Sequence, residues 1–265
     1  MSRLVAIAAL GTLTATLVVA GSAGSVAAED LPAGAAAVNL AQVQAAADHG
    51  DVQAQYQLGV IYDNGKGVAV DHHRAFDWFS RAAAQGMADA EFNVAIMYDQ
   101  GQGVQQSYVL AANWYNAAAS QGIAEAQYNL AMLYAQGQGE PQNDSSAAYW
   151  LYKSANQGYA PAQYNLGLAY QNGAGVAADP LMACHWFLQG AQQGDGDSQL
   201  QVAKCYESGR GGGQDLVRAY AWALLAAQGG EAGAADYLDH LNGVVNDQQK
   251  SYAVNLSDGL VTPKS

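Results

Sequence analysis

Residues of the types that carry out chemistry are few in this chain. It has five histidines and two cysteines among 265 residues. His72 and His73 are adjacent at the start of a predicted helix, so they point in different directions, and no two histidines stand four residues apart as in a helical zinc site. Neither a Gly-x-Ser-x-Gly nucleophile elbow nor a phosphate-binding loop is present. We therefore expect no metal, no cofactor and no enzymatic activity.

The acidic residues are placed as helix-start charges rather than as a catalytic pair. Asp89, Glu125 and Asp197 each fall in the first turn of a predicted helix, where a carboxylate meets the positive end of the helix dipole. The chain holds 23 Asp and Glu against 10 Lys and Arg, a net charge of −13 at pH 7. This charge repels phosphates and anionic headgroups, although it can also serve solubility alone. We expect a neutral or basic protein partner and no nucleic acid.

Two cysteines could form a disulfide. Cys184 lies ten residues before Gly194 and Cys205 eleven residues after it, so their depths match in an antiparallel helix pair that turns at this glycine. In an oxidising compartment such a pair would be joined. The alternative is that both are small buried hydrophobic residues. Cys205 stands in an apolar column of the repeat described next, with Ile61, Met97 and Leu133.

The elements that position these residues follow from a repeat. Every tryptophan lies 36 residues after the last, at Trp78, Trp114, Trp150, Trp186 and Trp222. A glycine column keeps the same interval, at Gly50, Gly86, Gly122, Gly158, Gly194 and Gly230. A fixed period of this size marks an array of stacked units. Because a buried aromatic ring removes a large apolar area from water, we interpret the tryptophans as core residues.

Each unit is predicted to hold two short helices around a Gly-x-Gly loop. Residues 53–62 place apolar side chains on one helical face, and Gly65 can take the left-handed conformation that ends a helix. A capping residue opens the second helix in every unit, in the column Asp71, Ser107, Asn143, Asp179 and Asp215. Both helices are too short to be stable alone, so the units must stack.

Several stretches resemble the Sel1-like repeat, a relative of the tetratricopeptide repeat. They are Ala126-Gln-Tyr-Asn-Leu-Ala-Met-Leu-Tyr134, Tyr98-Asp-Gln-Gly-Gln-Gly-Val104 and Ala111-Ala-Asn-Trp-Tyr-Asn-Ala-Ala118. Leu58, Gly59 and Tyr62 match the Leu-Gly-x2-Tyr element of the tetratricopeptide repeat, but the period is 36 rather than 34. The resemblance implies an all-α, right-handed α/α solenoid of five helix–turn–helix repeats with degenerate helical caps.

The expected domains follow from the period. Residues 29–50 are predicted to form a linker and a capping helix, and residues 231–265 to form C-terminal capping helices and a tail. The five repeats lie between them, over residues 51–86, 87–122, 123–158, 159–194 and 195–230.

Residues 1–28 have the composition of a cleavable signal peptide. A basic start at Arg3 is followed by an uncharged, apolar stretch and then by small residues up to Ala28. We expect cleavage near Ala28, a periplasmic or secreted location in a bacterium, and no membrane-spanning segment in the mature chain. An uncleaved anchor is the alternative.

The resemblance also implies where a partner binds. First helices line the concave groove of tetratricopeptide solenoids, which places in the groove an aromatic column, neighbouring amides and one cation. The candidate partner-binding residues are Tyr56, Phe92, Tyr128, Tyr164, Asn93, Asn129, Asn165 and Lys204. Aromatic rings and amides suit a peptide backbone or a sugar. The alternative, which these residue types favour, is that the rings pack between repeats and the amides bond the backbone.

Three functions follow from this organisation. The leading hypothesis is a non-enzymatic extracytoplasmic scaffold or adaptor that binds a protein on its concave face, in envelope signalling or assembly. A module that binds cell-wall glycan such as peptidoglycan is an alternative from another class. A hydrolase of cell-wall or β-lactam substrates is a remote third, because no catalytic constellation is visible.

Overall fold

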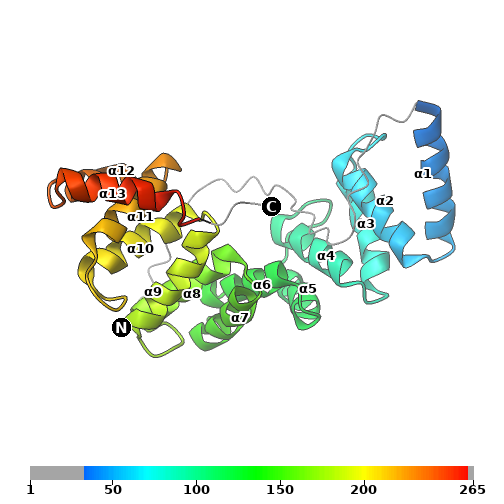
Figure 1. Ribbon diagram of the computed structural model, residues 1–265. Coiled ribbons are helices and arrows are strands. Elements are labelled where there is room, and N and C mark those ends of the chain that lie inside the picture. The colour runs from blue at the N-terminus through cyan, green and yellow to red at the C-terminus, as the bar shows by residue number, and fades with distance from the viewer. Residues whose placement is uncertain (1–32, 262–265) are drawn as a thin grey trace. The chain divides into compact units, whose positions relative to one another are not determined.

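The computed structural model describes the backbone of residues 33–261 and the side chains of residues 40–261 (Figure 1). The predicted signal segment lies outside the described residues. Within them every regular element is an α-helix, which confirms the all-α prediction. No helix in residues 33–261 combines the length and the apolar character that a membrane-spanning helix needs.

Each repeat consists of a first and a second helix, as expected. The first helices are α2 (Val52–Asn64), α4 (Ala88–Gln100), α6 (Ala124–Gln136), α8 (Ala160–Asn172) and α10 (Gly196–Ser208). The second helices are α3 (His72–Ala83), α5 (Tyr108–Ser120), α7 (Asp144–Asn156), α9 (Pro180–Gln192) and α11 (Leu216–Gln228). Helix α1 (Ala33–Asp48) precedes them, and α12 (Ala234–Asn242) and α13 (Asp247–Ser257) follow.

The chain forms two compact units, one up to Gln106 and one from Ser107 onward. In the first unit α1 packs on α2, α2 on α3 and α3 on α4. In the second unit each helix from α5 to α11 packs on the next, and α11 also packs on α12 and α13. Packing of neighbours in sequence is the pattern of a helical repeat array.

The predicted helix ends are confirmed. First helices stop at glycines with left-handed backbone, for example Gly137 with φ 68° and Gly173 with φ 69°. Second helices begin at the predicted capping column, where the side chain of Asn143 accepts a hydrogen bond from the Ser146 N–H at 3.0 Å. These caps satisfy backbone groups that a helix end leaves without a partner.

The tryptophan column is less uniformly buried than the sequence indicates. Trp78, Trp186 and Trp222 are buried, whereas Trp114 and Trp150 are half-exposed. Trp222 belongs to a cluster that includes Phe187 on α9 and Leu241 on α12. The interpretation as core residues therefore holds for three of the five tryptophans.

A column of buried glutamines joins successive helices, and the sequence analysis did not identify it. In the second unit the Gln127 side chain donates to Ala119 O at 3.0 Å and the Gln163 side chain to Ala155 O at 3.1 Å. Gln193 Nε2 in turn donates to Gln163 Oε1 at 2.7 Å. The accepting carbonyls lie in the last turn of a second helix, where intrahelical donors are missing. The glutamines therefore supply hydrogen-bond donors from the next repeat to the C-terminal carbonyls of each second helix.

Candidate functional site

The predicted aromatic column of the second unit consists of Tyr128 on α6 and Tyr164 on α8. Both side chains are half-buried. The Tyr128 ring lies 5.4 Å from the ring of Tyr159, and the Tyr164 ring 5.8 Å from that of Phe187. Asn165 Nδ2 donates to the Tyr128 hydroxyl at 3.4 Å, so an amide of the following repeat holds the ring in place.

The first unit repeats this arrangement with Tyr56 on α2. Its ring lies 5.5 Å from Phe79, and Asn93 Nδ2 donates to its hydroxyl at 3.4 Å. Phe92, the next member of the column, is partly buried on α4. Burial raises the pKa of the Tyr56 hydroxyl, and the nearby Asp89 adds to the rise, so the tyrosine stays neutral.

The amides of the candidate site are already engaged within the fold. Besides the tyrosine hydroxyls, Asn93 Nδ2 donates to Asp89 O at 2.8 Å and Asn165 Nδ2 to Pro161 O at 2.9 Å. Asn129 is half-buried at the equivalent position of α6. The amide N–H groups thus fix the helices and rings, and a role for these residues in partner binding stays a prediction.

Lys204, the cation of the candidate site, contacts the C-terminal capping helix α12. Lys204 is exposed on α10, and its Nζ lies 5.8 Å from the centre of the Tyr237 ring on α12. Leu200, which follows Tyr164 in the column, is buried. The aromatic column of the second unit therefore ends at Tyr164.

Three carboxylates crowd together beside Tyr164. Asp195 caps α10 by accepting from Ser198 N at 2.9 Å, and the Asp197 carboxyl lies beside that of Glu231. Gly196 makes room for this pair, because a Cβ there would lie 2.8 Å from Glu231 Oε2. Burial, followed by repulsion from Glu231 and Asp195, raises the pKa of Asp197 to about 6.

The same carboxylates act on Tyr164. Burial first, and then Asp197 as the largest of the nearby charges, raises the pKa of its hydroxyl to about 12. From the sequence Asp197 is expected to be a helix-start charge alone, and the sequence patterns do not predict that Asp195 and Glu231 lie beside it. The sequence does contain a signal for these two acids. They occupy the repeat position at which Met87, Ile123 and Tyr159 stand in earlier repeats.

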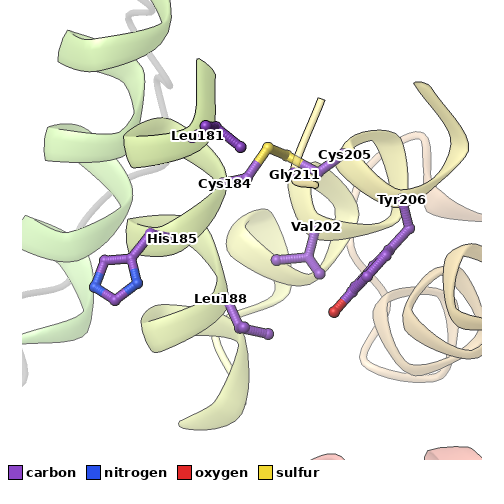
Figure 2. Close-up of a pocket in the computed structure, with 8 residues that line it drawn as sticks. All are labelled: Leu181, Cys184, His185, Leu188, Val202, Cys205, Tyr206 and Gly211. Atoms are coloured by element: carbon purple, nitrogen blue, oxygen red, sulfur yellow. A yellow bond between two sulfur atoms is a disulfide. The ribbon is translucent and has the colours of Figure 1, made fainter. Parts of the chain in front are cut away.

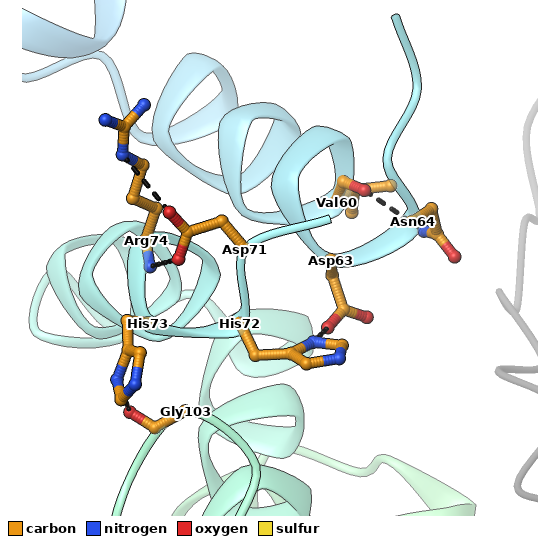
Figure 3. Close-up of polar contacts among 8 residues, drawn as sticks. All are labelled: Val60, Asp63, Asn64, Asp71, His72, His73, Arg74 and Gly103. Atoms are coloured by element: carbon orange, nitrogen blue, oxygen red, sulfur yellow. Dashed lines mark hydrogen bonds and ion pairs between the residues drawn. The ribbon is translucent and has the colours of Figure 1, made fainter. Parts of the chain in front are cut away.

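Histidines pair with acids at helix ends in both units. Figure 3 shows the imidazole of His72 turned toward Asp63, with 2.9 Å between Nδ1 and Oδ1, and His73 turned toward the carbonyl of Gly103. In the second unit Glu207 accepts from the Tyr237 hydroxyl and lies 2.7 Å from His240 Nε2. The Tyr237 bond, and then the His240 contacts, lower the pKa of Glu207 despite partial burial. Residues 40–261 contain no group of three or more His, Cys, Asp and Glu side chains arranged to hold a metal ion.

A disulfide and a pocket lie between α9 and α10. Cys184 and Cys205 are bonded, with their Cα atoms 6.0 Å apart. Figure 2 shows this bridge at one end of the pocket, next to Leu181 from α9, with Leu188 from α9 and Val202 from α10 below it. Of the two possibilities that the sequence left open, the structure has the bridged pair, and Cys184 is also buried.

The comparisons with known proteins agree with this architecture. The chain is similar to a structure described as a protective antigen present in uropathogenic Escherichia coli strains and displaying an SLR fold, with a TM-score of 0.76 and 33% identity. The match covers 83% of this chain and 49% of the antigen chain, so this chain spans about half of the antigen's length. A Sel1 repeat protein from Oxalobacter formigenes matches with a TM-score of 0.71 and 30% identity, over 85% of this chain and 97% of that one. No curated protein matches the sequence.

The Sel1 repeat matches five consecutive segments, residues 52–87, 88–123, 124–159, 160–195 and 196–231. These segments correspond to the helix pairs of the structure, from the pair α2 and α3 to the pair α10 and α11. The chain therefore belongs to the Sel1 repeat family, whose members are generally protein-interaction scaffolds.

Proposed function

We propose that this chain is a non-enzymatic, extracytoplasmic scaffold that binds a protein partner on the first-helix faces of its repeats. The observation that carries the proposal is the pair of half-buried rings, Tyr128 and Tyr164. An amide from the following repeat, that of Asn165, holds the Tyr128 hydroxyl, and the Tyr164 ring packs 5.8 Å from the ring of Phe187. Tyrosine rings that are fixed before binding lose little entropy in a complex, and tyrosine is enriched in protein interfaces.

The charge around Tyr164 supports a basic partner. Asp195, Asp197 and Glu231 lie together there, in a chain with a net charge of −13. A lysine or arginine of the partner would relieve the repulsion among these carboxylates. Complementary charge at an interface speeds association and excludes partners of the wrong sign.

An extracytoplasmic location is supported by two independent features. The composition of residues 1–28 is that of a signal peptide. The disulfide between Cys184 and Cys205 suits an oxidising compartment, because thiols are kept reduced in the cytosol.

The proposal is tested by photocrosslinking in the native cell envelope. A benzophenone amino acid replaces Tyr164 in one variant and the exposed Tyr252 on α13 in a control variant. We expect a protein adduct from position 164 that is absent from position 252 and becomes weaker in the presence of Tyr128→Ala or of high salt. Identical adducts from both positions, or no protein adduct above background at position 164, would contradict the proposal. Adducts with peptidoglycan fragments alone would favour the glycan alternative.

A further inference from the structure

The pocket between α9 and α10 has the dimensions of a side-chain receptor. Its volume is about 180 Å³, and Leu181, Leu188 and Val202 supply an apolar lining next to the disulfide (Figure 2). This volume holds several water molecules. It is smaller than the pockets of about 300–1,000 Å³ that enclose small-molecule ligands. One large aliphatic side chain matches its size and the apolar part of its lining, whereas His185 and Tyr206 supply polar atoms.

The walls of the pocket are fixed before any ligand arrives. The disulfide ties α9 to α10, and Gly211 lies against it, since a Cβ on Gly211 would be 3.3 Å from Cys184 Cβ. The equivalent glycines of the preceding loops, Gly139 and Gly175, lie instead against the backbone of the preceding second helix. The fifth repeat thus departs from the other loops of its unit at the pocket. A preformed receptor avoids the entropy that a flexible one loses on binding.

Two arginines adjoin lining residues of the pocket, although the chain is acidic. Arg210 is exposed immediately before Gly211. The Arg218 guanidinium lies 5.5 Å from the centre of the Tyr206 ring, which lines the pocket; its Nε is 3.5 Å from Asp215 Oδ2, and the side chain is 54% exposed. The acids nearby have partners within the fold. Asp179 and Asp215 cap α9 and α11, and Glu207 accepts hydrogen bonds from side chains on α12.

We propose that this pocket binds one large aliphatic side chain of a protein segment in which that residue is flanked by carboxylates. The aliphatic side chain fills the cavity between Leu181 and Val202, as the anchor residues of protein interfaces fill preformed pockets. The flanking carboxylates face Arg210 and Arg218. This specificity is opposite in sign to that of the carboxylates beside Tyr164. The site is separate from the first-helix faces and does not rest on the function proposed for them.

The test uses the purified full-length chain and defined peptides. The probe is the acetylated and amidated pentapeptide Ser-Asp-Leu-Asp-Ser, titrated while amide resonances are followed by ¹⁵N–¹H correlation spectra. We expect saturable shifts at Gly211, Val202 and Tyr206. Two peptides, one with lysines in place of the aspartates and one with glycine in place of leucine, should bind at least fivefold more weakly.

Two surface variants and their matched controls locate the site. Leu181→Ser removes an apolar wall from a residue that is 58% exposed, and Arg210→Glu reverses a loop charge, so neither disturbs the core. Each should weaken binding at least fivefold. Leu110→Ser, at an exposed leucine near the start of α5, and Lys153→Glu, at an exposed lysine on α7, should bind as the parent does. Absence of saturable shifts at the pocket, equal binding of all three peptides, or parental binding by Leu181→Ser and Arg210→Glu would overturn the proposal.

Discussion

At the scale of single residues, the environment of a side chain decides a role that its type leaves open. Asp197 and Asp89 occupy the same position of the repeat, near the start of a first helix. Asp197 lies against Glu231 and Asp195, which with burial raise its pKa to about 6. Gln163 shows the same dependence, because its amide is buried between two helices rather than exposed to solvent.

Asp197 makes the stability of the protein depend on pH. Its pKa is about 6 when folded against an ordinary value of 3.8, so the folded chain binds this proton more tightly than the unfolded chain does. Its stabilising contribution is complete below about pH 4 and is lost as the pH rises through about 6. We expect Asp197→Asn to raise the free energy of unfolding at pH 7 by roughly 0.5–1 kcal/mol, a value reduced for solvent screening.

Urea denaturation at pH 4 and pH 7 measures this effect. The gain should be present at pH 7 and absent at pH 4. Asp89→Asn is the control, and it should give no gain, because a carboxylate at the start of α4 is favoured by the helix dipole. Equal effects of the two substitutions at pH 7 would argue against repulsion at Asp197.

Gln163 tests the buried glutamine column. Gln163→Leu removes two buried hydrogen bonds, the one to Ala155 O and the one from the Gln193 amide, although Ala155 O keeps the Gly158 N–H and Gln193 keeps Gly158 O. Each hydrogen bond contributes about 0.5–1.5 kcal/mol net, so for the two lost bonds we expect the free energy of unfolding to fall by about 1–3 kcal/mol. Gln171→Leu, at an exposed position of the same helix, should change it by less than about 0.5 kcal/mol. Chemical denaturation of both variants makes the comparison, and equal losses would mean that the column adds no stability.

At the scale of elements, the loops and the disulfide determine how closely successive helices approach. The second glycine of the loop after α8, Gly175, lies against the backbone of Asp144 at the start of α7. Gly158 also has a positive φ, 88°, but no atom lies within 4 Å of the position of a Cβ there. These two glycines separate the effect of backbone conformation from the effect of close packing.

Substitution of both glycines by alanine should give different losses. Gly158→Ala lowers the free energy of unfolding only through the strain of the left-handed backbone, by on the order of 1–2 kcal/mol. Gly175→Ala also brings a Cβ into the Asp144 carbonyl, and overpacking of this kind adds about 1–3 kcal/mol. Thermal denaturation followed by circular dichroism should therefore show the lower Tm for Gly175→Ala. A Tm for Gly158→Ala that is equal or lower would refute close packing at the loop.

The disulfide stabilises the pair α9 and α10. It joins residues 21 positions apart, and closing a loop of this length in the unfolded chain is worth about 3 kcal/mol. The double variant Cys184→Ala/Cys205→Ala should lose about that amount in urea denaturation. The parent protein treated with dithiothreitol should approach the same value. No difference between the oxidised parent and the double variant would show that the bridge does not restrict the unfolded chain.

At the scale of the whole molecule, the last repeat needs helices that cover its apolar face. The cluster around Trp222 includes Leu241 and Val245 from the segment of α12 and the turn after it, and Ala253 from α13. A chain that ends at residue 230 exposes this cluster. We expect it to show red-shifted tryptophan fluorescence and a loss of cooperativity in denaturation. Parental fluorescence and stability in the shortened chain would show that α12 and α13 are dispensable.

The sequence by itself determined the local features of this protein. The 36-residue period, the capping column and the glycines that end the first helices were all predicted and found. Each of them depends on interactions within one helical turn or on the backbone conformation of a single residue. Such interactions can be inferred from residue types at fixed spacing, and the family resemblance rests on the same residues.

Only the tertiary structure decided which distant side chains meet. The glutamine column, the contact of Asp197 with Glu231 and the pocket beside Gly211 join residues about 30 positions apart. The choice between a disulfide and two buried thiols at Cys184 and Cys205 was likewise open until the two helices were placed. The physical reason is that all repeats share one packing pattern. Repeats differ only at the positions that vary in sequence. The role of a varying residue depends on which residues of the next repeat it contacts.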